Sequence, residues 1–152
     1  MKQILIILFI TLSLQLSAQK EGKWLLNSMY VGSIICNGIG DGLNDSGNKG
    51  IGHVMNAVSI SFLLVTPFVY DFTGDAWWKA VIKYGFIRIG FFDFAYNTTR
   101  GLPLNYIGNT SYWDTKFMQK IKPPDGFAFG RAVFTTIGFS IPINKTKNGR
   151  GD

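Results

Sequence analysis

The fold of this chain depends on GIGHVMNAVSISFLLVTPFVY, residues 50–70, a run of 21 residues without Asp, Glu, Lys or Arg. About 20 apolar residues in a helix span the hydrocarbon core of a bilayer, and the centre of this run, residues 57–65, is strongly apolar. Pro67 lies near its end, where membrane helices tolerate a break because neighbouring helices satisfy the freed carbonyl group. We predict a transmembrane helix over residues 51–70. The alternative is a buried helix of a soluble domain.

A second long helix is predicted over residues 77–97, after the short turn 71–75. The paired Trp77 and Trp78 at its start are typical of a membrane interface. We expect its charged residues to face other helices or water rather than lipid. These are Lys83, Arg88 and Asp93. The two segments together predict a helical hairpin of residues 51–70 and 77–97.

The segments around this hairpin give weaker signals. Residues 25–40 form another uncharged stretch that contains asparagines and glycines, so it either spans the membrane or lies in the interface. Residues 38–50 are rich in Gly, Asn and Asp, which predicts an irregular connection between helices. Residues 98–125 have no helical pattern and predict an ordered loop. Residues 127–143 have the length of a helix, but their apolar residues recur at nearly every second position. The pattern therefore fits either a helix or a strand.

The amino terminus has the three parts of an export signal. Lys2 supplies a positive charge, residues 4–16 are mostly apolar, and residues 17–19 are Ser-Ala-Gln, where a peptidase could cut. The apolar part is too short to span a bilayer comfortably. We therefore divide the chain into a signal peptide (1–19), one helical membrane-associated domain (20–144) and a polar tail (145–152).

Composition excludes several classes of protein. Of the 152 residues, 47% are hydrophobic and only 16% are charged, which excludes a disordered chain and a coiled coil. The net charge of +6 comes from scattered basic residues, so we expect no nucleic-acid partner. The single Cys36 can form neither an internal disulfide nor a thiolate metal site, and no motif for a nucleotide or another cofactor is complete.

These observations predict an all-α fold, a small helical membrane bundle built on the hairpin. An exported, aromatic-rich chain of this length also fits a small outer-membrane β-barrel of eight strands of about 10 residues. The run over residues 50–70 does not alternate, however, and the chain does not end in an aromatic strand. The helical bundle is therefore preferred.

A polar stripe is expected on the helix that precedes Arg100. At about 100° per residue, Asp93, Asn97 and Arg100 fall within about 60° of one another, and Tyr96 lies close by. Polar groups inside a membrane bundle indicate a functional site. We take Tyr96, Asn97 and Arg100, with Asn56 of the first helix, as candidate binding residues. The structural alternative is an internal ion pair that orients helices.

The only histidine, His53, follows the glycine-rich segment that carries Asp41 and Asp45. If that segment folds back over the start of the helix, His53 and these carboxylates could meet Asp93 and act as acid and base. We expect no metal site, because the sequence has no second histidine and no paired ligand motif. This constellation is the basis of an alternative function, a membrane-embedded hydrolase of lipid or cell-wall substrates.

The sequence thus predicts an exported integral membrane protein of the bacterial cell envelope, with the inner membrane as the favoured location. Its expected role is structural or partner-binding rather than enzymatic. The lipid bilayer is the expected partner, and another membrane protein is kept open. The basic loop 98–125 is expected in the cytoplasm and the acidic turn 71–75 outside, which requires residues 25–40 to cross as well.

Overall fold

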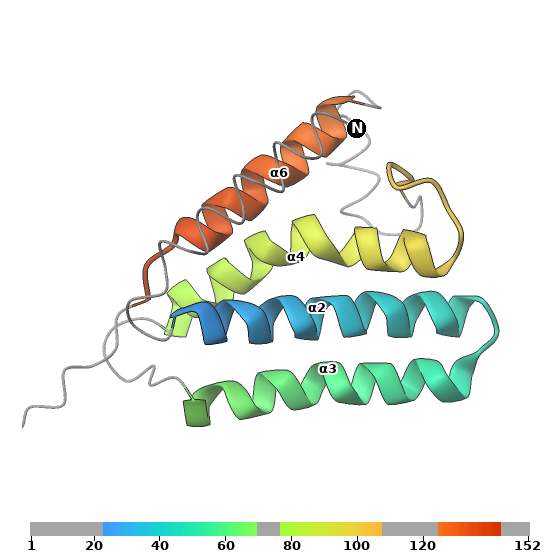
Figure 1. The fold of residues 1–152 in the computed structure, drawn as a ribbon, viewed down its shortest axis with the longest axis horizontal. Helices are drawn as coiled ribbons and strands as arrows, with labels where there is room; N and C mark the ends of the chain where they lie inside the picture. Colours follow the sequence, from blue (N-terminus) through green and yellow to red (C-terminus); the bar gives the residue numbers. More distant parts are fainter. Residues whose placement is uncertain (1–22, 70–76, 108–124, 144–152) are drawn as a thin grey trace, which may run out of the picture.

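The structure, a computed structural model, describes residues 23–69, 77–107 and 125–143 (Figure 1). These residues form four helices: α2 (Lys23–Asp45), α3 (Lys49–Val69), α4 (Trp77–Thr99) and α6 (Asp125–Ser140). The described ranges contain no strand, which confirms the all-α fold there and gives no support to the barrel alternative. The predicted signal peptide, the turn 71–75, most of the loop 98–125 and the tail lie outside the described residues.

Three helices form a layer in which α2 lies between α3 and α4 (Figure 1). α2 and α4 run in one direction, α3 runs in the opposite direction, and α6 packs obliquely on α4. The helices predicted over residues 51–70 and 77–97 are confirmed to within two residues at each end. Their pairing as a hairpin is wrong, because each of them packs on α2 instead.

α2 continues through most of the glycine-rich segment that predicted an irregular connection. Only Ser46–Asn48 join it to α3. The amide of Asn48 donates to the carbonyl oxygen of Leu43 at 2.9 Å, the hydrogen bond that closes many helix ends. Gly47 makes this turn with a φ of 89°, which residues with a Cβ atom rarely adopt. The prediction of an irregular connection over residues 38–50 is therefore wrong for most of its length.

Glycines allow α2 to approach both of its neighbours closely. A Cβ atom at Gly38 would lie 2.6 Å from the carbonyl oxygen of Phe92, and Gly42, one turn later, faces the same helix α4. On the other side, a Cβ atom at Gly40 would lie 2.9 Å from the carbonyl oxygen of Gly52 in α3. Small residues at such spacings let helix backbones pack closely, a common arrangement in membrane bundles.

Lys83 joins α4 to the C-terminal end of α6. Its side chain is only 4% exposed. The ammonium group donates to the carbonyl oxygens of Gly138 and Phe139 at 3.0 Å and of Ile141 at 3.2 Å. The last carbonyl groups of a helix lack partners within the helix and carry the negative end of its dipole, so a buried ammonium group is stabilised there. As the sequence predicts, this charge faces another helix.

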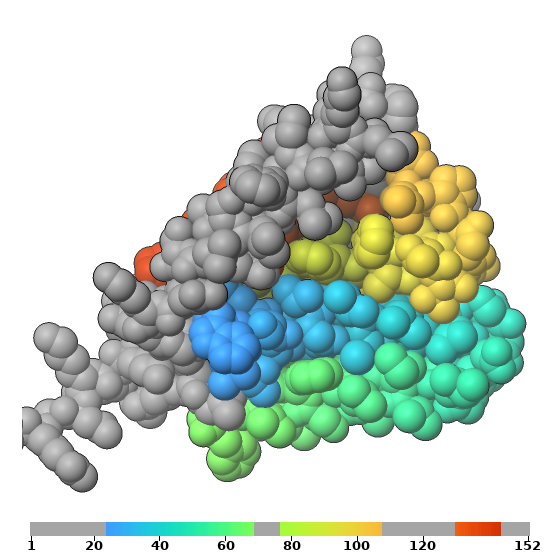
Figure 2. All heavy atoms as spheres, in the orientation of Figure 1, coloured from blue at the N-terminus to red at the C-terminus, as the bar shows by residue number. Residues whose placement is uncertain are grey.

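α3 has an unusual distribution of side chains. It packs on α2 along one side and forms an outer edge of the molecule (Figure 2). Its buried residues include Ser59 and Thr66, whereas large apolar side chains along its length are exposed. These are Ile51, Val54, Val58, Ile60, Leu64, Val65 and Phe68. Among the described helices, α3 alone is long and apolar enough to cross a membrane by length and composition.

Candidate functional site

A polar network joins the three helices of the layer. It consists of Asn37 and Asp41 from α2, Asn56 from α3 and Arg88 from α4, which we call the central polar cluster. The Asn56 amide donates to Asp41 Oδ1 at 2.9 Å, and the Asn37 amide donates to Asn56 Oδ1 at 3.1 Å. Arg88 Nη1 donates to Asn37 Oδ1 at 2.6 Å, and its guanidinium carbon lies 4.1 Å from the centroid of the Phe92 ring.

All four residues of this cluster are half-buried. Removing one partner would leave others without a hydrogen bond at a site that water reaches only in part, and such groups are costly to leave unpaired. One turn earlier on α2, the buried Ser33 hydroxyl lies 3.1 Å from that of Ser59 and 3.4 Å from that of Tyr84. Polar contacts therefore connect all three helices at two successive turns of α2.

A second group, the end cluster, lies where α2 and α4 both end. The Tyr96 hydroxyl donates to the carboxylate of Asp45 and accepts a hydrogen bond of 2.8 Å from Arg100. Arg100 Nη1 also lies 3.7 Å from Asp45 Oδ2. The hydrogen bond with Tyr96 raises the pKa of the Arg100 guanidinium further above its usual range, so Arg100 stays charged. All of these contacts are made near the surface, where ion pairs contribute little stability.

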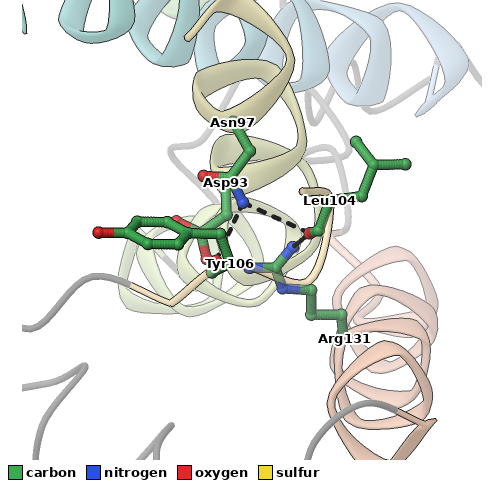
Figure 3. Close-up of polar contacts among 5 residues, drawn as sticks. All are labelled: Asp93, Asn97, Leu104, Tyr106 and Arg131. Carbon is green, nitrogen blue, oxygen red and sulfur yellow. Dashed lines mark hydrogen bonds and ion pairs between the residues drawn. The ribbon is translucent and has the colours of Figure 1, made fainter. Parts of the chain in front are cut away.

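Figure 3 shows a third group, the loop cluster, between α4, α6 and the segment 101–107. Arg131 of α6, which is 9% exposed, places Nη2 2.5 Å from Asp93 Oδ2. Its Nη1 donates to the carbonyl oxygen of Leu104 at 3.3 Å. One guanidinium group thus links a carboxylate of α4 to the backbone of the segment that follows α4.

The same segment is held by Asn97, whose side chain is 1% exposed. Its amide donates to the carbonyl oxygens of Tyr106 at 3.0 Å and of Leu104 at 3.4 Å (Figure 3). Asn97 therefore supplies hydrogen-bond donors to backbone carbonyl groups of the non-helical segment that follows α4. Its role in the structure is to anchor the segment 101–107.

The predicted polar stripe of α4 is divided between two neighbours. Asp93 and Asn97 face α6 and the following segment, whereas Tyr96 and Arg100 face Asp45 of α2. An ion pair does orient the helices, but Asp93 makes it with Arg131 and not with Arg100. The stripe is divided because α4 packs on both α2 and α6, and neighbouring residues of the stripe reach different partners.

The structure does not bring together the groups that the hydrolase hypothesis requires. His53 is exposed on α3, and the three carboxylates belong to three different clusters: Asp41 to the central, Asp45 to the end and Asp93 to the loop cluster. Within the described ranges, no group of three or more His, Cys, Asp or Glu side chains could hold a metal ion. The candidate catalytic set therefore has no common site in this part of the chain.

Sequence reasoning missed Asn37 and Arg131 and assigned no role to Arg88. Asn37 and Asp41 are four residues apart, a spacing that places two polar side chains on one helical face. That signal was obscured because the predicted irregular connection over residues 38–50 contains Asp41 but begins after Asn37. Arg131 lies in the segment 127–143, where the spacing of apolar residues fits both a helix and a strand. The direction of the Arg131 side chain could therefore not be predicted.

Comparison with known proteins identifies no relative. No protein-family model matches the chain, and neither a curated protein nor a solved structure is similar to it. A functional assignment therefore depends on the geometry of the helices and clusters.

Replacing Asn97 by Asp is expected to release the segment 101–107. The carboxylate has nearly the same shape as the amide but cannot donate, and it would face two carbonyl oxygens. Leaving buried polar groups unpaired costs about 1–3 kcal/mol, so cleavage of this segment by chymotrypsin should become about 5- to 150-fold faster. Asn105→Asp is the matched control, because Asn105 is exposed in the same segment. Equal cleavage rates of the two variants would show that Asn97 does not anchor the segment.

Proposed function

We propose that the protein is an exported integral membrane protein of the cell envelope, located in the inner membrane, with a structural or partner-binding role. The observation that carries this proposal is the reversed polarity of α3. Its exposed side chains are mostly apolar, whereas Ser59 and Thr66 are buried. In water such a helix would bury its apolar face instead.

The interior of the bundle supports the same proposal. Asp41, Asn56 and Arg88 hold three helices together by hydrogen bonds between side chains, and glycines let the backbones approach. Lipid offers no hydrophobic drive for helices to associate, so membrane bundles depend on close packing and on interhelical hydrogen bonds of this kind. In this proposal, the hydrogen bonds of the central polar cluster hold α2, α3 and α4 together inside the bundle.

The proposed absence of catalysis is supported by how the carboxylates are used. Asp41 accepts hydrogen bonds from asparagine amides, Asp45 accepts one from Tyr96, and Asp93 is paired with Arg131. Each carboxylate thus orients neighbouring helices. Export of the chain is proposed from residues 1–19 alone, which have the pattern of a signal peptide.

The test is fractionation of the expressed full chain, with a carbonate wash of the membranes and an intact-mass measurement. Retention in washed membranes, with the mass of residues 1–18 or 1–19 lost, supports the proposal. Release by carbonate, or recovery of soluble protein, would overturn the membrane assignment. An unchanged mass would overturn the proposal that the signal is cleaved.

A pair of variants distinguishes insertion of α3 into the bilayer from non-specific sedimentation with the membranes. Ile60 lies near the middle of α3 and is 57% exposed, so arginine there would face solvent in a soluble protein at little cost. In a bilayer, arginine at the centre of a helix costs about 2.5–3.5 kcal/mol, and Ile60→Arg should strongly reduce the membrane-retained protein. Asn48→Arg, in the exposed turn, is the control and should be retained like the parent chain.

A further inference from the structure

Four exposed aromatic side chains lie at one end of the helical layer. They are Trp24 (51% exposed), Phe68 (89%), Trp77 (72%) and Trp78 (50%). Each lies within two residues of a helix end: the start of α2, the end of α3 or the start of α4. Because α3 runs opposite to its two neighbours, these three helix ends lie together (Figure 1). We call these four residues the aromatic end.

The opposite end of the layer has a different surface. It carries the exposed turn 46–48 and the end cluster of Asp45, Tyr96 and Arg100, and no tryptophan among the described residues. The two ends therefore differ in chemistry although the helices between them are similar in length. Exposed indole rings gathered at one level of a helical bundle are typical of a membrane–water interface, where the ring meets both apolar and polar surroundings.

We infer that the aromatic end lies in the phospholipid headgroup region on the outer face of the inner membrane, and that the turn 46–48 lies on the cytoplasmic side. This inference rests on the proposed function and adds to it the contact surface and the orientation. We assign lipid to this surface, because three separate helices present rings at the same level and each of these side chains is at least 50% exposed.

Charge at the aromatic end is complementary to phospholipid. The ammonium group of Lys79 lies 5.6 Å from the centroid of the Trp78 ring. Lys23 is the first residue of α2, whose start lies at the aromatic end. Lysine side chains beside interfacial aromatic rings extend toward the phosphate groups, and each contributes attraction to an anionic membrane surface.

Helix length determines where the other end must lie. α2 and α4 each have 23 residues and α3 has 21, so they extend about 34 and 32 Å, close to the hydrocarbon thickness of about 30 Å. α2 is less apolar overall than α3, but its polar Asn27 and Ser33 are buried rather than exposed. α3 alone is apolar enough to cross by its own composition, so in this arrangement α2 and α4 cross packed together with it, and the turn 46–48 lies at the second interface.

The direction follows from the proposed export signal. Cleavage after residue 18 or 19 leaves the new amino terminus outside, only a few residues before α2 begins. α2 then enters the membrane from the outer face, and α3 returns to it. The connection between α3 and α4 is accordingly outside.

Orientation is tested with single-cysteine variants in a Cys36→Ala background, labelled with a membrane-impermeant maleimide. Thr73→Cys should react in intact spheroplasts and be protected in inverted membrane vesicles. Asn48→Cys and Asn105→Cys should show the opposite pattern, with at least a tenfold difference between preparations. The reverse pattern in carbonate-resistant protein would overturn the orientation while leaving the membrane assignment intact. Equal labelling of all three in soluble protein would overturn the proposed function itself.

The depth of the aromatic end is tested separately by fluorescence of the Trp113→Phe variant, which retains only Trp24, Trp77 and Trp78. The variant is reconstituted in phosphatidylcholine vesicles whose acyl chains are brominated either near the headgroup or near the methyl end. We expect the shallow bromines to quench at least twofold more strongly. Stronger quenching by the deep bromines, or quenching by aqueous iodide as for free tryptophan, would overturn the interfacial placement.

Discussion

Gly38→Ala is expected to destabilise the bundle by about 1–3 kcal/mol, the usual cost of forcing extra atoms into a packed interface. The added Cβ atom would lie 2.6 Å from the carbonyl oxygen of Phe92 and 2.9 Å from the Cβ atom of Ala95. Neither neighbour is a flexible side-chain end, so α2 and α4 have to separate. Thermal unfolding followed by circular dichroism in detergent measures the loss.

The matched control is Gly85→Ala, the same substitution inside α4. Nothing lies within 4 Å of a Cβ atom at this position. Alanine favours a helix over glycine by about 1 kcal/mol, so Gly85→Ala should be neutral or stabilising. Gly38→Ala should therefore lower the midpoint of unfolding, whereas Gly85→Ala should leave it unchanged or raise it. A shift of the same sign and size for both would mean that α2 and α4 do not approach as closely as the structure indicates.

The second large effect is expected for Arg131→Met, which should cost about 3 kcal/mol. Breaking a buried ion pair from one side costs about 3–5 kcal/mol, and the partial exposure of Asp93 favours the lower value. The substitution also removes the donor to Leu104. We expect α6 to loosen from α4, with a lower midpoint of unfolding.

A double-variant cycle separates the ion pair from general damage. Asp93→Leu combined with Arg131→Met leaves no unpaired charge at the contact and should recover part of the loss. Arg100→Met is the control, because its pair with Asp45 is exposed and should contribute at most about 1 kcal/mol. Additive effects of Asp93→Leu and Arg131→Met would contradict a coupled pair.

The sequence predicts α3 and α4 well because their signals are local. An uncharged apolar run and an aromatic pair at a helix start depend on neighbouring residues only. α2 was recognised only in part, because glycine, asparagine and aspartate are typical of turns in a single sequence. In the folded chain, Gly38 and Gly42 are contact points with α4, and this depends on a helix that begins more than 30 residues later.

The candidate site was predicted less well for a related reason. The angular position of Asp93 and Asn97 on one helix was sound, but the partner of Asp93 is Arg131, 38 residues away. Helical periodicity gives the direction of a side chain and not the identity of the helix that lies there. The position of α2 between α3 and α4 also separates Asp45 from Asp93, which local spacing could not show.

The central position of α2 has a consequence for biogenesis. The chain is synthesised from its amino end, so α2 is made before either of the helices that surround it. A three-residue turn brings α3 beside it first, and Asn56 can then meet Asp41. Arg88 follows only when α4 is made. Among the described helices, the first to be synthesised is therefore enclosed on both sides only when α4 is made, and in the membrane location proposed above its polar face has to be kept from lipid until then.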